Sequence, residues 1–110
     1  MAAQDPTIRN IKIKTGVLKR LVKEKVMYEK ESCDLEAKLE QMKTDGKDPY
    51  DINKQRQVLE ESQMMIPDCG RRIKKAFAEL QTMLETSKDF EENEDYQKAS
   101  SLIEEVSPNV

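Results

Sequence analysis

Residues 43–51 read KTDGKDPYD, and this stretch decides the fold because it stops one helix and starts another. Gly46 suits the end of a helix, since glycine adopts the left-handed backbone conformation without steric cost. Asp48 followed by Pro49 is a typical helix start, with an N-cap residue before a proline in the first helical position. A stop and a start this close together predict a helical hairpin.

The segment before this link is expected to form one long helix over residues 6–44. It opens with Asp5-Pro6, the same pairing of N-cap residue and first-turn proline, and no other proline precedes the link. Its apolar residues repeat every seven positions, which is typical of a long helix packed against a partner helix. The repeat consists of Ile11, Leu18 and Leu39 at one seam position and of Leu21, Tyr28, Leu35 and Met42 at the other.

A second long helix is expected over residues 49–86. It carries the same seven-residue spacing, in the order Ile52, Leu59, Ile66, Ile73 and Leu80. The spacing continues through Pro67, although this proline removes one backbone hydrogen bond and crowds the preceding turn. We therefore expect a single helix with a kink at Pro67.

A shorter third helix is expected over residues 88–106, after a capping-box pattern at residues 86–89. The positions that flank the seams of the two long helices are apolar only at the open end of the hairpin, so the third helix is expected to pack there. The sequence thus predicts an all-α fold in which residues 1–110 form one domain. The domain is expected to be an elongated antiparallel three-helix bundle.

The net charge of −3 conceals two blocks of opposite sign. Residues 1–30 hold eight Lys or Arg against three Asp or Glu, whereas residues 85–105 hold two against eight. An up-down-up bundle places the third helix beside the first half of the first helix. We therefore expect the two blocks to face each other.

Composition argues against several function classes. The chain contains no histidine, and it shows no glycine-rich phosphate loop, so we expect neither an enzyme nor a bound cofactor or metal. No apolar run approaches the roughly 18 residues of a membrane span, and residues 1–10 do not resemble a signal peptide. These features favour a cytoplasmic protein with no membrane role. The low sequence pI of about 5.1 disfavours nucleic acid as a partner.

Two surface features indicate where a protein partner would bind. The basic stretch KIKTGVLKRLVKEK at residues 12–25 is compatible with a solvated face balanced by the third helix, a phosphate-binding surface or a calmodulin-type target. Apolar residues outside the seams, with methionines beside the proline, would make an adaptable contact surface. Together they predict partner-binding residues at Lys12, Ile13, Val17, Lys19, Arg20, Lys23, Met27, Val58, Met64 and Met65.

Gly16 lies inside the first helix, where glycine costs about 1 kcal/mol relative to alanine. Either the glycine is simply tolerated, or a partner approaches the helix closely at this position. The sequence leaves both interpretations open.

Three blocks cover nearly the whole chain: IKIKTGVLKRLVKEKVMYEKE at residues 11–31, YDINKQRQVLEESQMMIPDCGRR at residues 50–72, and DYQKASSLIEEV at residues 95–106. They resemble the tubulin-binding cofactor A family, also called tubulin-specific chaperone A. The resemblance implies a cytosolic, non-enzymatic three-helix protein that needs no nucleotide. It also implies that the protein captures and stabilises β-tubulin folding intermediates on the way to the αβ heterodimer.

From this resemblance we expect β-tubulin as the partner, with other tubulin-folding cofactors as further candidates, and a cytoplasmic, cytoskeleton-associated location. No cofactor, nucleic acid or membrane is expected. Basic residues would steer the association and apolar residues would hold the contact. The alternative is a structural coiled-coil adaptor that dimerises through the long hairpin, so the protein is expected to be a monomer or a weak homodimer.

Overall fold

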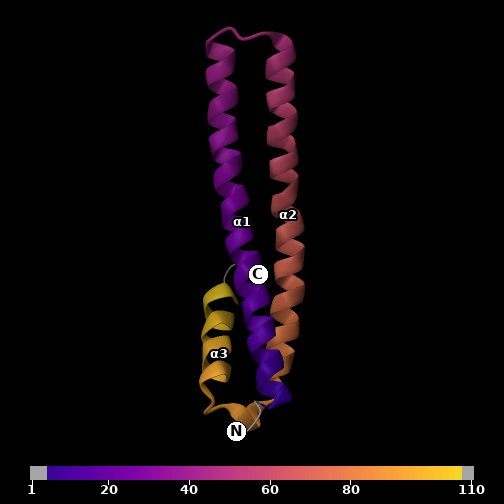
Figure 1. The fold of residues 1–110 in the computed structure, drawn as a ribbon, viewed down its shortest axis with the longest axis vertical. Helices are drawn as coiled ribbons and strands as arrows, with labels where there is room; N and C mark the ends of the chain where they lie inside the picture. The colour runs from indigo at the N-terminus through magenta and orange to yellow at the C-terminus, as the bar shows by residue number, and fades with distance from the viewer. Residues whose placement is uncertain (1–4, 108–110) are drawn as a thin grey trace. The chain divides into compact units, whose positions relative to one another are not determined.

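The computed structural model describes residues 5–107, which form helices joined by short links (Figure 1). The α-helices are α1 (Pro6–Thr44), α2 (Pro49–Glu85) and α3 (Glu94–Val106), and a 3-10 helix, η1 (Lys88–Phe90), precedes α3. The described residues contain no strand. The predicted all-α class, with two long helices and a shorter third, is confirmed. No helix in this part of the chain is long and apolar enough to span a bilayer.

Both long helices start at the Asp-Pro pairs. A side-chain oxygen of Asp5 accepts a hydrogen bond from the backbone N–H of Thr7 at 2.8 Å, and Asp48 accepts one from Tyr50 at 2.7 Å. Each carboxylate thereby satisfies one of the N–H groups that the first helical turn leaves without an internal partner. The proline that follows each aspartate has no N–H to satisfy.

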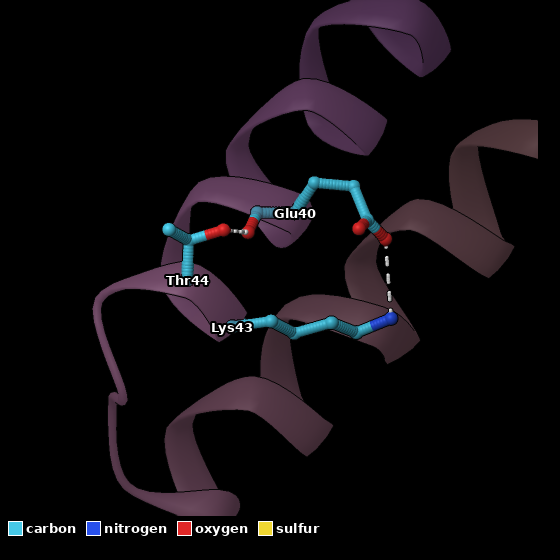
Figure 2. A network of polar contacts seen from close by, with 3 residues as sticks. All are labelled: Glu40, Lys43 and Thr44. Atoms are coloured by element: carbon cyan, nitrogen blue, oxygen red, sulfur yellow. Dashed lines mark hydrogen bonds and ion pairs between the residues drawn. The ribbon is translucent and has the colours of Figure 1, made fainter.

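The end of α1 follows from the backbone of Gly46, which has a φ of +69°. In this left-handed conformation the N–H of Gly46 reaches the carbonyl of Lys43 at 3.1 Å, and the N–H of Lys47 reaches that of Met42 at 3.0 Å. These two bonds are the pair that defines a Schellman cap. Figure 2 shows the side chains of the last turn, where Lys43 pairs with Glu40 at 3.2 Å and the Thr44 hydroxyl donates to the Glu40 carbonyl at 3.0 Å.

The chain divides into two compact units, and each long helix contributes to both. The bundle unit comprises the described residues of Met1–Val22 and Arg71–Val110. The hairpin unit comprises Lys23–Gly70.

The bundle unit has a continuous apolar core. Side chains from all three α-helices meet in it, and Ile11, Leu18, Leu80 and Ala99 are completely shielded from solvent. Around them pack half-buried apolar residues such as Tyr96 and Ile103 of α3. The Tyr96 hydroxyl also donates to the carbonyl of Leu84 at 2.9 Å. Helix α3 therefore covers an apolar face of the long helices, as its sequence pattern predicts.

The hairpin unit has a narrower and more polar interior. Its α1 and α2 segments lie side by side below the link (Figure 1). Leu39 and Leu59 are buried there. Ser32 of α1 and Ser62 of α2 are also buried, and their hydroxyl oxygens lie 3.1 Å apart. At the margin, the Gln63 amide donates to the Glu36 carboxylate at 3.0 Å.

Helix α3 starts later than the capping-box pattern predicts, because a different residue caps it. Ser87 makes no side-chain cap bond, and only the single turn of η1 follows it. The side-chain oxygen of Asn93 instead accepts from the N–H groups of Asp95 and Tyr96, so the α-helix begins at Glu94. The predicted start at residue 88 is therefore wrong by six residues.

Helix α2 continues through Pro67 without a break. The proline therefore does not end the helix, while the kink expected there stays a prediction.

Candidate protein-binding surfaces

The first candidate surface is the outer side of α1 in the bundle unit, which we call the basic face. It consists of Arg9, Lys12, Ile13, Gly16, Lys19 and Arg20. These positions follow the three- to four-residue spacing that keeps residues on one side of a helix. All six are exposed, because the core takes the opposite side of the helix through Ile8, Ile11 and Leu18.

The basic face carries four cations, Arg9, Lys12, Lys19 and Arg20. Among the described residues, none of these four side chains forms an ion pair. Ile13 lies in their midst and leaves 54% of its surface exposed. The face therefore offers uncompensated positive charge around one large apolar side chain.

Lys14 is also basic, but it is engaged within the fold. Its ammonium donates to the carboxylate of Glu79 on α2 at 2.9 Å. This hydrogen bond and the positive charge of Lys14 lower the pKa of Glu79 below its ordinary value of 4.5. Lys14 therefore links α1 to α2 inside the bundle unit.

A shallow cleft of about 480 Å³ runs along one edge of the basic face. Lys19 and Thr15 of α1 line it together with α3 residues that include Glu94, Lys98 and Glu105. Within α3, Lys98 pairs with Glu94 at 3.1 Å. The acidic helix thus lies near one cation of α1, but it forms no ion pair with Lys12, Lys19 or Arg20 in the part of the chain described.

The second candidate surface is in the hairpin unit and is apolar. On α1, Val26 and Met27 leave 60% and 59% of their surface exposed, and on α2 Met64 leaves 71% exposed. Val58 is also exposed, and Met65 is half-buried. Large apolar side chains held on regular helices are available for contact without any rearrangement of the backbone.

The predicted partner-binding residues fall in both units. The bundle unit holds Lys12, Ile13, Val17, Lys19 and Arg20, and the hairpin unit holds Lys23, Met27, Val58, Met64 and Met65. Eight of these ten are exposed. Val17 packs against the core of the bundle unit, so only part of it faces solvent.

Sequence reasoning overlooked three exposed residues. Arg9 lies one turn before Lys12 on the basic face, and Val26 lies beside Met27. Extending the three- to four-residue spacing of the predicted binding residues along α1 in both directions would have identified Arg9 and Val26. Tyr50 is exposed at the start of α2, where the Lys54 ammonium lies 5.1 Å from the centre of its ring in a cation–π contact.

The described residues include no cluster of three or more Cys, Asp or Glu side chains arranged to hold a metal ion. The two surfaces offer positive charge and exposed apolar area for contact with another protein. Exposed surfaces of this kind on ordered helices are typical of a class of helical proteins that bind other proteins.

Within that class, the chain belongs to the tubulin binding cofactor A family, whose sequence model matches residues 6–103. Human tubulin-specific chaperone A is 55% identical over 102 residues, which cover 93% of this chain and 94% of the human protein. Tubulin-folding cofactor A of Arabidopsis thaliana is 50% identical over 88 residues, which cover 80% of this chain and 78% of the plant protein.

Solved structures of the family are similar to this fold. The human tubulin chaperone cofactor a matches with a TM-score of 0.79 at 52% identity, over 93% of this chain and 99% of the human one. The crystal structure of tubulin folding cofactor A from Arabidopsis thaliana matches with a TM-score of 0.82 at 44% identity, over 93% and 96% of the two chains. The resemblance inferred from the three sequence blocks is thereby confirmed.

Proposed function

We propose that this protein is a tubulin-folding cofactor that binds β-tubulin folding intermediates and holds them until they enter the αβ heterodimer. Family membership and the names of the relatives support tubulin as the client. The observation that carries the holding role is the exposure of Val26, Met27 and Met64 on regular helices.

Holding requires a surface that covers apolar area on an incompletely folded client. Helices that are already formed lose little backbone entropy on binding, so more of the contact energy remains as affinity. Methionine adapts its shape to irregular apolar surfaces, because it is unbranched and has a polarisable sulfur. A bound client exposes less apolar surface, which lowers the concentration of the species that aggregates.

The cations of α1 would guide the encounter. Uncompensated charges such as those of Lys12, Lys19 and Arg20 attract an acidic client before contact and raise the association rate. Lys23, at the start of the hairpin unit, would add to this attraction. Added salt screens the attraction, so the association rate should fall as ionic strength rises.

The proposed action consists of binding alone, without catalysis, cofactor, nucleic acid or membrane. We place it in the cytoplasm, in association with the cytoskeleton. Other tubulin-folding cofactors are further candidate partners, as proteins that would deliver or receive the client.

The test is co-purification of the folded protein with α-tubulin and β-tubulin offered separately. Selection of β-tubulin is the expected result. Equal capture of both tubulins would overturn the β-specificity, and capture of neither would overturn the tubulin function. Sedimentation of the protein alone distinguishes the coiled-coil adaptor, which predicts a dimer.

The apolar surface is tested by Met64→Asp combined with Met65→Asp, which should weaken capture of β-tubulin by about tenfold or more, as loss of a central apolar contact does. Asn53→Asp combined with Gln57→Asp is the matched control, because both residues are exposed on α2 and the pair adds the same two negative charges. It adds negative charge without removing apolar area. Unchanged binding by the methionine variant, with helical content intact by circular dichroism, would exclude these methionines from the contact.

A further inference from the structure

We infer that the basic face of α1 docks an acidic helical segment of the tubulin client and that Gly16 is the point of closest approach between the two helices. The inference rests on the proposed tubulin function. It adds the location of one contact, the chemistry of the segment that binds there, and a role for Gly16.

Nothing within the fold requires a glycine at position 16. A Cβ atom built there would meet no other atom within 4 Å, and Gly46 is the described glycine whose φ is positive. Gly16 also lies in the interior of α1, where alanine would favour the helix more. The glycine therefore weakens the free protein without relieving any strain or crowding inside it.

The missing side chain has a geometric effect on the outer surface. It leaves a low point on the basic face, one turn after Ile13 and one turn before Lys19 and Arg20. A small residue at a crossing point lets two helices approach to about 8 Å between axes, near the lower end of the usual range. A helix that crosses here would bring its own side chains against Ile13 and the flanking cations.

The charges specify the chemistry of this segment. Four cations without counter-ions in the described chain surround Ile13, so the complementary surface carries Asp or Glu beside an apolar side chain. From Arg9 to Arg20 the face spans eleven residues, or about 16 Å along the axis, which suits three turns of a partner helix. An acidic amphipathic helix fits both the charge and the length.

A nucleic acid strand is the competing occupant of any basic surface. The basic face contains no aromatic side chain for base stacking, and its centre is an isoleucine beside a glycine. Phosphate contacts gain nothing from either residue, whereas an amphipathic helix uses both. These features favour a protein segment.

The deciding experiment separates stability from binding at Gly16. Gly16→Ala should raise the Tm of the free protein by about 4 °C or more, because alanine favours the helix interior. It should nevertheless weaken tubulin binding several-fold, and the larger Gly16→Gln should weaken it by about tenfold or more. Opposite effects on stability and binding are not expected of a residue that is merely tolerated.

Gly70→Ala is the matched control. Gly70 lies inside α2, and a Cβ atom there would likewise meet nothing within 4 Å. This substitution should raise the Tm and leave binding unchanged. If Gly16→Gln binds tubulin as wild type does, the docking site is wrong.

The charges are tested separately with Lys12→Glu combined with Arg20→Glu. Lys38→Glu combined with Lys47→Glu gives the same change in net charge at exposed positions of the hairpin unit. The first pair should slow association much more than the second. Equal effects would overturn specific docking in favour of net charge alone.

Offering α-tubulin and β-tubulin separately distinguishes this inference from the proposed function. If wild type selects β-tubulin and Gly16→Gln does so equally well, the inference fails and the function stands. If wild type captures both tubulins and Gly16→Gln weakens both, the docking site stands and the β-specificity fails. Displacement of bound tubulin by a DNA oligonucleotide at physiological salt would overturn the protein segment in favour of nucleic acid.

Discussion

The bundle unit and the hairpin unit each contain part of α1 and part of α2, but they differ in how many apolar side chains they bury. In the bundle unit ten apolar side chains form one buried cluster. In the hairpin unit the buried residues are Leu39, Leu59 and Cys69 together with two serines. Five of the six large apolar residues that the described chain exposes lie in the hairpin unit. Both units therefore contain large apolar side chains, but the bundle unit buries most of its own and the hairpin unit exposes several of its own.

The physical origin of the difference is the third helix. Two helices alone bury only a narrow seam, whereas a third helix also covers the positions that flank the seam. Phe77 and Leu84 occupy such flanking positions and are buried in the cluster that includes Ala99 of α3. We therefore expect the bundle unit to supply most of the stability, whereas the hairpin unit holds most of the exposed large apolar side chains.

The largest expected effect comes from truncating the core of the bundle unit. Leu80→Ala should lower the free energy of unfolding by about 3 to 4 kcal/mol, because Leu80 is fully buried and its loss leaves a cavity. Leu59→Ala in the hairpin unit should cost less, about 2 kcal/mol, since fewer buried apolar residues surround it. Urea unfolding measures both. An equal or larger cost for Leu59→Ala would contradict the assignment of stability to the bundle unit.

A smaller effect is expected at the buried hydroxyl pair of the hairpin unit. Ser32→Ala should cost about 1 to 2 kcal/mol, because it leaves the hydroxyl of Ser62 buried without its partner. Adding Ser62→Ala should recover most of that loss, since no unpaired hydroxyl remains. A double-mutant cycle measures the coupling. Additive losses would show that the two hydroxyls do not depend on each other.

The smallest effect concerns the ion pair of the bundle unit and depends on pH. Because Lys14 lowers the pKa of Glu79 in the folded state, the pair stabilises the fold at pH above 4.5. This contribution is lost as the pH falls through the lowered folded-state pKa. Glu79→Gln should therefore be less stable than wild type at neutral pH, and the gap should close in acid.

Unfolding at several pH values measures this gap. Glu61→Gln in the hairpin unit is the control, because it neutralises an exposed carboxylate on the same helix. Its difference from wild type should change less with pH than that of Glu79→Gln, because Glu61 forms no ion pair with another described residue. A constant gap for Glu79→Gln would mean that the contact with Lys14 does not affect stability.

Local signals predicted the parts of the fold that local chemistry controls. Asp5 and Asp48 cap the long helices and Gly46 ends the first, because a cap depends on a few adjacent residues. The start of α3 was missed because residues 86–89 carry capping residue types, while Asn93 has the geometry that satisfies the helix N–H groups. Sequence types alone do not choose between competing caps.

The candidate surfaces were predictable in outline only. Helical spacing identified Met27 and Met64 as lying outside the seams, and both are exposed. The same spacing did not show that Val17 packs against the core, because that burial depends on neighbours distant in the chain. It also did not show which lysines are engaged in ion pairs.

By itself, the sequence determined that this chain is all-helical, where its first helix ends, and to which family it belongs, because caps, spacing and similarity reside in the order of residues. Tertiary structure decided which half of each long helix has a broad core, since only packing of α3 buries the flanking positions. It also decided that Lys14 pairs with Glu79, while the cations of the basic face form no ion pair with any other residue from 5 to 107. Pairing requires two side chains to meet in space, and sequence spacing does not specify that meeting.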